Sequence, residues 1–220
     1  GLDQHRTAYA FQGVQSDVII RGNNITSKSN GPSLGIYVAS MFGESSELLI
    51  EDNFINVTGS ASPSGNWALV SGIEIQNGNA KIYNNTIYTQ NVIPFEKGAY
   101  IYGISYAQWM YGDRSFDIQN NTVYTDGAYT ISVINSTSLN VEGNTLYARE
   151  LAGDDSINPG LCEDVVLSEN IPYKKDVIIV SDDYIWMETD ASVKVTVIAP
   201  GNVTVKLNGR EIAIEQALIS

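Results

Sequence analysis

The sequence predicts an all-β protein in which a parallel β-helix is followed by a short antiparallel β-sandwich module. Two observations predict the β-helix: a ten-residue motif that occurs five times, and a shorter apolar motif between its copies. A third observation, the change to short alternating strands after residue 176, predicts the second module. We place the β-helix at 1–160, a cap or linker at 161–175 and the sandwich module at 176–220.

The ten-residue motif carries apolar residues at fixed distances from an asparagine. Its copies are 18–27, 48–57, 80–89, 116–125 and 139–148. An apolar residue stands three positions before the asparagine and another stands two positions after it, and the asparagines are Asn23, Asn53, Asn85, Asn121 and Asn144. Matches at the same positions in every copy indicate stacked coils of a solenoid, here about five to six coils.

The shorter motif reads GIYV (35–38), GIEI (72–75), GISY (103–106) and TISV (130–133). Its apolar residues alternate with other residues, which is typical of a strand and not of a helix. We expect the following side chains to point inward: Ile36, Val38, Ile73, Ile75, Ile104, Tyr106, Ile131 and Val133. Each repeat therefore holds at least two strand segments joined by turns.

A leucine-rich repeat is the alternative solenoid, and it fails on one position. It requires a leucine five residues before the second apolar position, where this chain has Gln15, Ser45, Asn77, Asp113 and Ser136. In a parallel β-helix, asparagine suits the tight turn because it tolerates a left-handed backbone and its amide bonds to neighbouring coils. We expect a stacked asparagine ladder that pairs these buried amides.

The C-terminal third changes character. Short alternating strands are expected at 177–180, 184–187, 193–198, 203–207 and 211–214, with Asn208-Gly209 as a tight hairpin turn. An immunoglobulin sandwich needs about seven strands, so five indicate a small or truncated module. The chain begins at Gly1 without an initiator Met, and we expect an excised part of a longer protein.

Composition excludes several classes of function. With 25 acidic and 12 basic residues the net charge is -13, which disfavours nucleic acid and anionic membrane surfaces as partners. The sequence contains no run of 18 or more apolar residues, so it predicts no membrane-spanning segment. The sequence has one cysteine, Cys162, and one histidine, His5, so we expect no intrachain disulfide and no metal centre. We also expect no cofactor, and we expect the protein to be a monomer. Calcium at Gly153-Asp154-Asp155 is the weak exception, because its spacing matches no known loop.

Three stretches resemble the adhesin-like surface proteins of methanogenic archaea: the motif I-x-N-N-T-[IV]-Y-T, the segment YTISVINSTSLNVEGNTLYARELAGDDSI and the tail VTVIAPGNVTVKLNGREI. The resemblance covers nearly the whole chain. It implies a right-handed, single-stranded parallel β-helix followed by an immunoglobulin-like module. It also implies an extracellular, cell-surface location and adhesion to glycans or to a partner cell surface without catalysis. The resemblance supplies no catalytic motif.

A polysaccharide lyase or glycoside hydrolase is the main alternative, because pectate lyases and polygalacturonases are also β-helices. A hydrolase of this type needs paired aspartates, and the family adds a Gly-His-Gly turn. Neither occurs in the coils, where Asp113, Arg114 and Asp117 form the only mixed cluster. We interpret that cluster as solvated loop charge. A passive stalk, with binding elsewhere in a parent protein, is the third hypothesis.

Aromatic residues are the candidate ligand-binding residues. Tyr88, Tyr124 and Tyr147 occupy one motif position on successive coils and should stack outward, roughly 5 Å apart. Such a ladder either packs on sugar rings or only stabilises neighbouring coils. Trp67, Trp109 and Tyr111 lie on inserts, where exposed aromatics are typical binding residues. The alternative is that these loop aromatics fold back over the coil flank.

Overall fold

The computed structural model describes eleven stretches of the chain: residues 7–14, 17–39, 46–61, 69–91, 100–107, 113–149, 156–174, 178–181, 195–198, 205–207 and 210–212. Every regular element in these residues is a β-strand. The chain divides into two compact units, Gly1–Lys174 and Lys175–Ser220.

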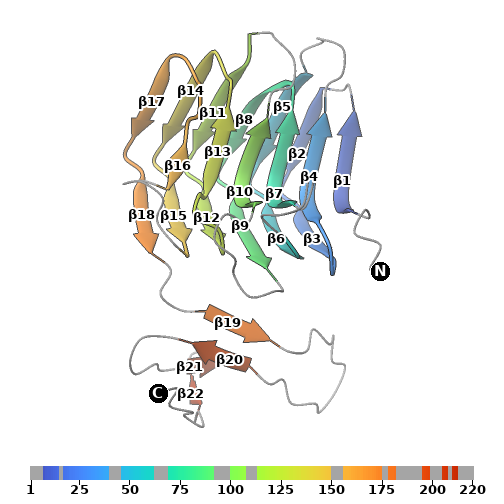
Figure 1. The fold of residues 1–220 in the computed structure, drawn as a ribbon, viewed down its shortest axis with the longest axis vertical. Coiled ribbons are helices and arrows are strands. Elements are labelled where there is room, and N and C mark those ends of the chain that lie inside the picture. Colours follow the sequence, from blue (N-terminus) through green and yellow to red (C-terminus); the bar gives the residue numbers. More distant parts are fainter. Residues whose placement is uncertain are drawn as a thin grey trace. The chain divides into compact units, whose positions relative to one another are not determined.

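The first unit consists of three parallel sheets, each with six strands (Figure 1). Sheet A contains β1 (Ala8–Val14), β4 (Ser33–Ala39), β7 (Leu69–Gln76), β10 (Tyr100–Ala107), β13 (Ile131–Ile134) and β16 (Ile157–Asn158). Sheet B contains β2 (Val18–Arg21), β5 (Ser46–Glu51), β8 (Gly78–Tyr83), β11 (Ser115–Gln119), β14 (Ser138–Glu142) and β17 (Val165–Ser168). Sheet C contains β3 (Asn24–Lys28), β6 (Phe54–Gly59), β9 (Thr86–Asn91), β12 (Thr122–Thr125), β15 (Thr145–Ala148) and β18 (Ile171–Lys174).

Consecutive strands pass from one sheet to the next, so each coil contributes one strand to each sheet. This is the all-β, parallel β-helix-like repeat that the sequence predicts. The ten-residue motif forms two strands with a turn between them, one in sheet B and one in sheet C. The shorter motif forms the strand in sheet A.

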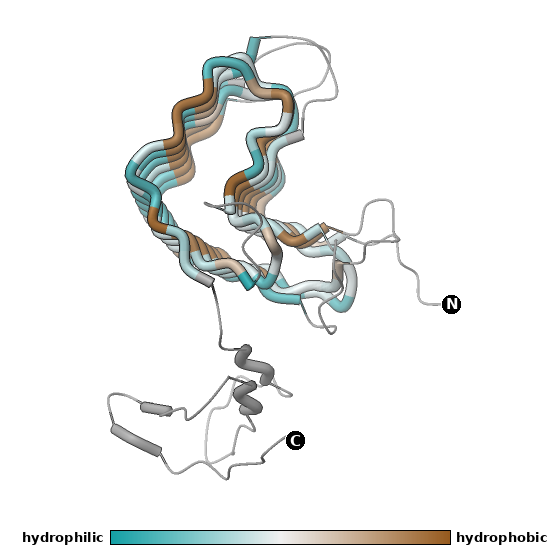
Figure 2. Tube along the Cα trace, turned by 60° about the vertical axis from the view of Figure 1, so that its left-hand side comes forward, coloured by the Kyte–Doolittle hydropathy of each residue, from teal (hydrophilic) through white to brown (hydrophobic). Residues whose placement is uncertain are grey.

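The interior is filled by apolar side chains that stack from coil to coil, and Figure 2 shows these stacks as brown bands along the coils. All the side chains of the shorter motif that were expected to point inward lie in this core, which confirms the alternation argument. Ile50, Ile82 and Ile118 form one such stack on sheet B, and all three are fully buried. Continuous apolar stacks of this kind supply the hydrophobic stabilisation of the unit.

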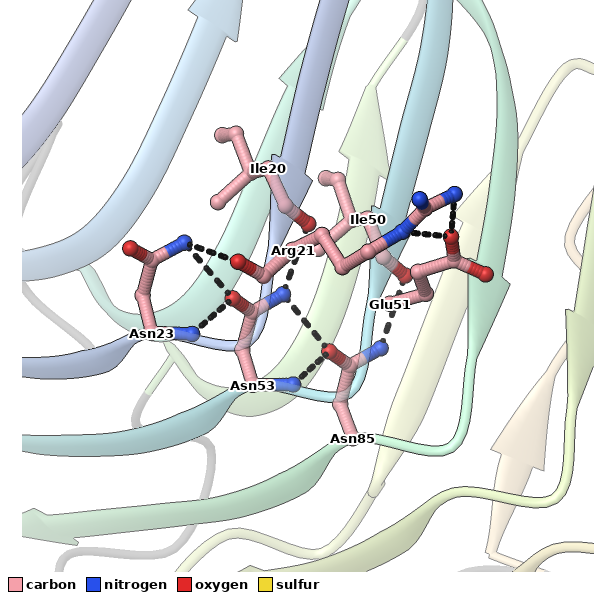
Figure 3. A network of polar contacts seen from close by, with 7 residues as sticks. All are labelled: Ile20, Arg21, Asn23, Ile50, Glu51, Asn53 and Asn85. Atoms are coloured by element: carbon pink, nitrogen blue, oxygen red, sulfur yellow. Dashed lines mark hydrogen bonds and ion pairs between the residues drawn. The ribbon is translucent and has the colours of Figure 1, made fainter.

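The predicted asparagine ladder is confirmed at the turn between sheets B and C (Figure 3). The Asn53 amide donates to Asn85 Oδ1 at 3.0 Å and to the Ile20 carbonyl oxygen at 2.9 Å. The Asn53 backbone N–H also donates to Asn85 Oδ1, at 3.0 Å. The same three bonds repeat from coil to coil as far as Asn170, so the buried amides are satisfied. Beside the ladder, Arg21 forms an ion pair with Glu51.

The left-handed backbone lies one residue earlier than the sequence argument placed it. The residue immediately before each ladder asparagine has a positive φ: Gly22, Asp52, Asn84, Asn120, Gly143 and Glu169. The ladder asparagine follows this position and provides hydrogen bonds. The two properties that we assigned to one asparagine are therefore divided between two neighbouring residues.

The β-helix sheets run past residue 160, where we expected the repeat to end. The strands β17 and β18 pair with β14 and β15, and they belong to a sixth coil that extends to Lys174. Asn170 continues the ladder by accepting a hydrogen bond from the Asn144 amide at 2.9 Å. We predicted a cap or linker at 161–175 because residues 149–175 are acidic and lack the ten-residue motif.

The second unit contains two antiparallel pairs in the part of the chain that is described. The strand β19 (Ile178–Ser181) pairs with β20 (Val195–Ile198), and β21 (Val205–Leu207) pairs with β22 (Arg210–Ile212). The expected strand at 184–187 and the Asn208-Gly209 turn lie outside the described residues.

Candidate functional site

The predicted tyrosine ladder exists on the outer face of sheet C. The ring centroids of Tyr88 and Tyr124 lie 4.5 Å apart, and those of Tyr124 and Tyr147 lie 4.4 Å apart. The rings are nearly parallel, with interplanar angles of 3° and 6°. Tyr173 extends the stack at 4.8 Å, and Phe54 packs on Tyr88 at the other end with a tilt of 45°.

Within this ladder Tyr88, Tyr124 and Tyr147 each have a ring from a neighbouring coil on both sides. A sugar packs on an aromatic ring through the face, and here the faces of Tyr124 are occupied by Tyr88 and Tyr147. Burial raises the pKa of the Tyr124 hydroxyl, and the neighbouring tyrosines contribute to the shift. The contacts therefore match the second of our two interpretations, in which the stack stabilises adjacent coils.

The remaining sequence-predicted residues do not gather at one place. Trp67, Trp109, Tyr111 and the segment 153–155 lie outside the described residues. The cluster of charged residues at 113–117 is dispersed. Arg114 is buried and donates to the Asp113 carbonyl oxygen at 2.8 Å, whereas Asp117 accepts from the Asn140 amide at 2.9 Å. Asp117 also accepts from Tyr83, whose pKa is raised to about 12 by burial and by this carboxylate.

Sheet A is bent at a row of stacked glycines. A Cβ on Gly72 would lie 2.3 Å from Ile87 Cγ2 and 2.7 Å from the Gly103 carbonyl oxygen, so only glycine fits there. Val70, two residues before Gly72, and Ile73, the residue after it, both belong to the core. Inward side chains three positions apart break the two-residue period of a strand, so the strand turns inward between them. Figure 2 shows one wall of the coil with such an inward bend.

The bend brings together side chains on the outer face of sheet A. On one side of it, Tyr9, Leu34, Ser71 and Tyr102 form one row across the strands. On the other side, a second row consists of Gln12, Tyr37, Glu74, Ser105, Ser132 and Asn158. The two rows meet, because the Ser71 and Ser105 hydroxyl oxygens lie 2.8 Å apart. We call Tyr9, Tyr37, Ser71, Glu74, Tyr102 and Ser105 the Glu74 strip.

Glu74 lies at the floor of this strip, with 4% of its surface exposed. Burial raises the pKa of its carboxyl to about 7, although hydrogen bonds from the Ser105 hydroxyl and the Gln76 side chain partly oppose the shift. It is the only charged residue in the six strands of sheet A. A carboxyl with this pKa exchanges its proton near neutral pH.

Tyrosines form the sides of the strip. Tyr37 donates to Gln76 Oε1 at 3.1 Å, and its ring packs on Tyr9 with centroids 5.2 Å apart. Burial raises the pKa of Tyr102 to about 12, with contributions from Tyr100 and Glu74. Tyr9 is 42% exposed, and Tyr100, which lies outside the strip on the same strand as Tyr102, is 48% exposed. The strip therefore combines a polar buried floor with exposed aromatic edges, the composition of a surface that binds polar, ring-shaped ligands.

Sequence reasoning did not select the Glu74 strip. The alternation in GIEI (72–75) does place Glu74 on the outer face, between the inward residues Ile73 and Ile75. What the motif does not reveal is that Tyr37, Ser105 and Tyr102 lie beside it, since they come from 28 to 37 residues away in the chain. Their contact depends on the register of the coils and on the bend at Gly72.

No family model, curated protein or solved structure matches this chain. In the residues that the structure describes, no helix is long and apolar enough to cross a membrane. The same residues contain no group of three histidine, cysteine, aspartate or glutamate side chains placed to hold a metal ion.

Proposed function

We propose that this chain is an extracellular, cell-surface adhesin-like protein that binds glycans, including those of a partner cell surface, without catalysis. Under this proposal, it carries a right-handed parallel β-helix and a small immunoglobulin-like module, as the sequence resemblance implies. The Glu74 strip is the proposed binding surface. The observation that carries the proposal is the association of exposed and half-buried tyrosines with a row of hydrogen-bonding side chains on one sheet face.

The physical argument concerns what a sugar ring requires. Its C–H face packs on an aromatic ring, and its hydroxyls need donors and acceptors at fixed positions. Tyr9 and Tyr37 supply ring surface, and Glu74 supplies an acceptor that the Ser105 hydroxyl, itself bonded to Ser71, holds in place. The strands hold these groups rigidly, which lowers the entropic cost of binding. The tyrosine ladder of sheet C lacks free ring faces between its members, so we assign it a structural role.

Affinity electrophoresis through native gels that contain different polysaccharides tests this proposal, with the gels stained afterwards for polymer. We expect retardation by at least one polymer, without a cleared zone. Tyr9→Ala should lose the retardation, because it removes an exposed ring from the strip. Tyr124→Ala is the matched control on sheet C and should keep it. Retardation by no polymer would favour the passive stalk and overturn the proposal.

A polysaccharide hydrolase or lyase is the second candidate function, and the pKa of Glu74 favours it. A general acid in glycoside cleavage needs a carboxyl that remains protonated near neutral pH, which a pKa of about 7 permits. However, most glycosidases use two carboxyl groups, and the six strands of sheet A contain only one. A cleared zone in the gel that Glu74→Gln abolishes would establish catalysis in place of adhesion.

A further inference from the structure

The Glu74 strip carries one acidic side chain, and the strands that form the strip carry no basic side chain. The strands of sheet A contain no lysine, arginine or histidine. Among the described residues, the ion pair of Arg21 with Glu51 lies on sheet B, and no basic side chain contributes to the pKa shift of Glu74. Among the described residues, Ser105 and Gln76 donate hydrogen bonds to Glu74, and Tyr37 and Tyr102 are titratable groups near it.

A buried carboxylate without a cation is unfavourable, because desolvation is not compensated by an opposite charge. Hydrogen bonds from Ser105 and Gln76 offset part of this cost, and the carboxyl retains a preference for its proton. A ligand that brings a positive charge to Glu74 would remove that preference. The binding of such a cation and the ionisation of Glu74 are therefore coupled.

The tyrosines beside Glu74 favour the same kind of ligand. The face of an aromatic ring carries partial negative charge and attracts an ammonium group that lies within about 6 Å of the ring centroid. Tyr37 lies directly opposite Glu74 in the register of β4 and β7, and Tyr102 lies in the adjoining row, opposite Ser71. Burial raises the pKa of both tyrosines, and the charge of Glu74 adds to the shift. Tyr9 adds a third ring, which packs on Tyr37. A carboxylate accepts a hydrogen bond from either a hydroxyl or an ammonium group, but only the ammonium group also compensates its charge and is attracted to the tyrosine rings.

We propose that the Glu74 strip selects glycans that carry a cationic nitrogen, such as polymers of amino sugars with unsubstituted or alkylated amines, over their neutral N-acetylated counterparts. This inference rests on the proposed glycan-binding function and specifies the class of sugar. Glu74 pairs with the ammonium group, and Tyr37 and Tyr9 pack on the sugar and its cationic substituent.

The test compares two oligomers of equal length, one of trimethylammonium-substituted glucosamine and one of N-acetylglucosamine, by calorimetric titration. The trimethylammonium group keeps its charge at every pH, so any pH dependence reports on the protein. At pH 8 and about 0.15 M salt, which screens long-range attraction to the net charge of -13, we expect at least tenfold tighter binding of the cationic oligomer. Between pH 8 and pH 6 this preference should fall about tenfold, as Glu74 becomes protonated.

Two variants assign the effect to this carboxylate. Glu74→Gln keeps the size of the side chain and one acceptor oxygen but removes the charge, and it should bind both oligomers equally at both pH values. Glu142→Gln on sheet B removes the same charge from another face and should keep the full preference. Circular dichroism of each variant before titration establishes that it is folded.

The outcomes separate this inference from the proposal on which it rests. Equal affinity of the wild-type protein for the two oligomers would overturn the preference for cationic sugars and leave glycan binding intact. A preference that persists in Glu74→Gln would also overturn it, because net charge would then be the cause. If no polysaccharide retards the protein in the gels and neither oligomer binds, glycan binding itself is overturned.

Discussion

At the scale of single residues, the ladder asparagines and Glu74 illustrate two different treatments of a buried polar group. Each interior asparagine amide is fully hydrogen-bonded to the coils on either side of it, so its burial is compensated. Glu74 is hydrogen-bonded but not charge-compensated by the described residues, and its pKa rises accordingly. Compensated groups support the fold, whereas an uncompensated group in a surface strip marks a place where a ligand gains energy by binding.

Replacing an interior ladder asparagine should destabilise the fold more than replacing a terminal one. Asn121 is 1% exposed and bonds to Asn85, Asn144 and the Ile82 carbonyl oxygen. Asn121→Ala leaves several of these groups unsatisfied, so we expect a loss of about 3 kcal/mol in the free energy of unfolding. Asn23→Ala, at the exposed end of the ladder, should cost only about 1 kcal/mol. Urea denaturation measures both, and equal costs would contradict the ladder argument.

Glu74 should make the stability of the protein depend on pH around neutrality. Its pKa is about 7 in the fold against 4.5 in the unfolded chain, so the folded state binds the proton more tightly. The stabilisation is complete below about pH 4.5 and is lost as the pH rises through about 7. At pH 8 the ionised carboxyl costs about 3 kcal/mol.

Glu74→Gln removes this term, because glutamine carries no charge. We expect the variant to be more stable than the wild-type protein at pH 8 and similar to it at pH 4.5, as measured by urea denaturation at the two values. Glu142→Gln controls for the change in net charge. A pH profile that Glu74→Gln leaves unchanged would show that another group causes the dependence.

At the scale of elements, the glycine row sets the shape of sheet A. Gly35, Gly72 and Gly103 occur at the start of three copies of the shorter motif, and each contacts the backbone of the next coil too closely for a side chain. This close approach bends the strands and brings the outward residues of the Glu74 strip together. On sheet C, in contrast, the outward side chains of neighbouring coils are in contact through large stacked aromatic rings.

Gly72→Ala should therefore disturb both stability and binding. Its Cβ would overlap Ile87 and the Gly103 carbonyl, and relief requires the strands to move apart. We expect a loss of at least about 2 kcal/mol in urea denaturation and weaker retardation in the polysaccharide gels. Gly160→Ala is the matched control, because its new methyl group would meet only ordinary contacts of 3.4 to 3.9 Å. If the two variants were equally stable, the packing argument for the bend would fail.

At the scale of the whole molecule, the excess of acidic over basic residues affects both stability and binding. The net charge of -13 on 220 residues produces self-repulsion, which keeps the protein soluble but opposes the compact state. The charged side chains lie mostly outside the apolar interior of the coils, where salt screens their repulsion. The same negative field favours the approach of cationic ligands, which is the class that we assign to the Glu74 strip.

Salt should consequently stabilise the protein. Raising sodium chloride from about 0.02 M to about 0.5 M shortens the Debye length from more than 20 Å to less than 5 Å and should raise the thermal midpoint by a few degrees. Differential scanning calorimetry measures the midpoint, and potassium chloride at the same concentrations should have the same effect. A midpoint that falls with salt would show that attractive ion pairs outweigh the repulsion.

The sequence by itself determined the all-β class, the parallel coil, the inward residues and the stacking of both ladders. It could do so because side-chain alternation and a repeated register are local properties, and each copy of Asn85 or Tyr124 occupies the same place on its coil. Only the tertiary structure revealed that the last coil extends through Lys174, that a left-handed residue precedes each ladder asparagine, and that the Glu74 strip forms. Burial, the bend at Gly72 and the contacts of Glu74 depend on residues that are distant in sequence, and no local pattern records which of them meet.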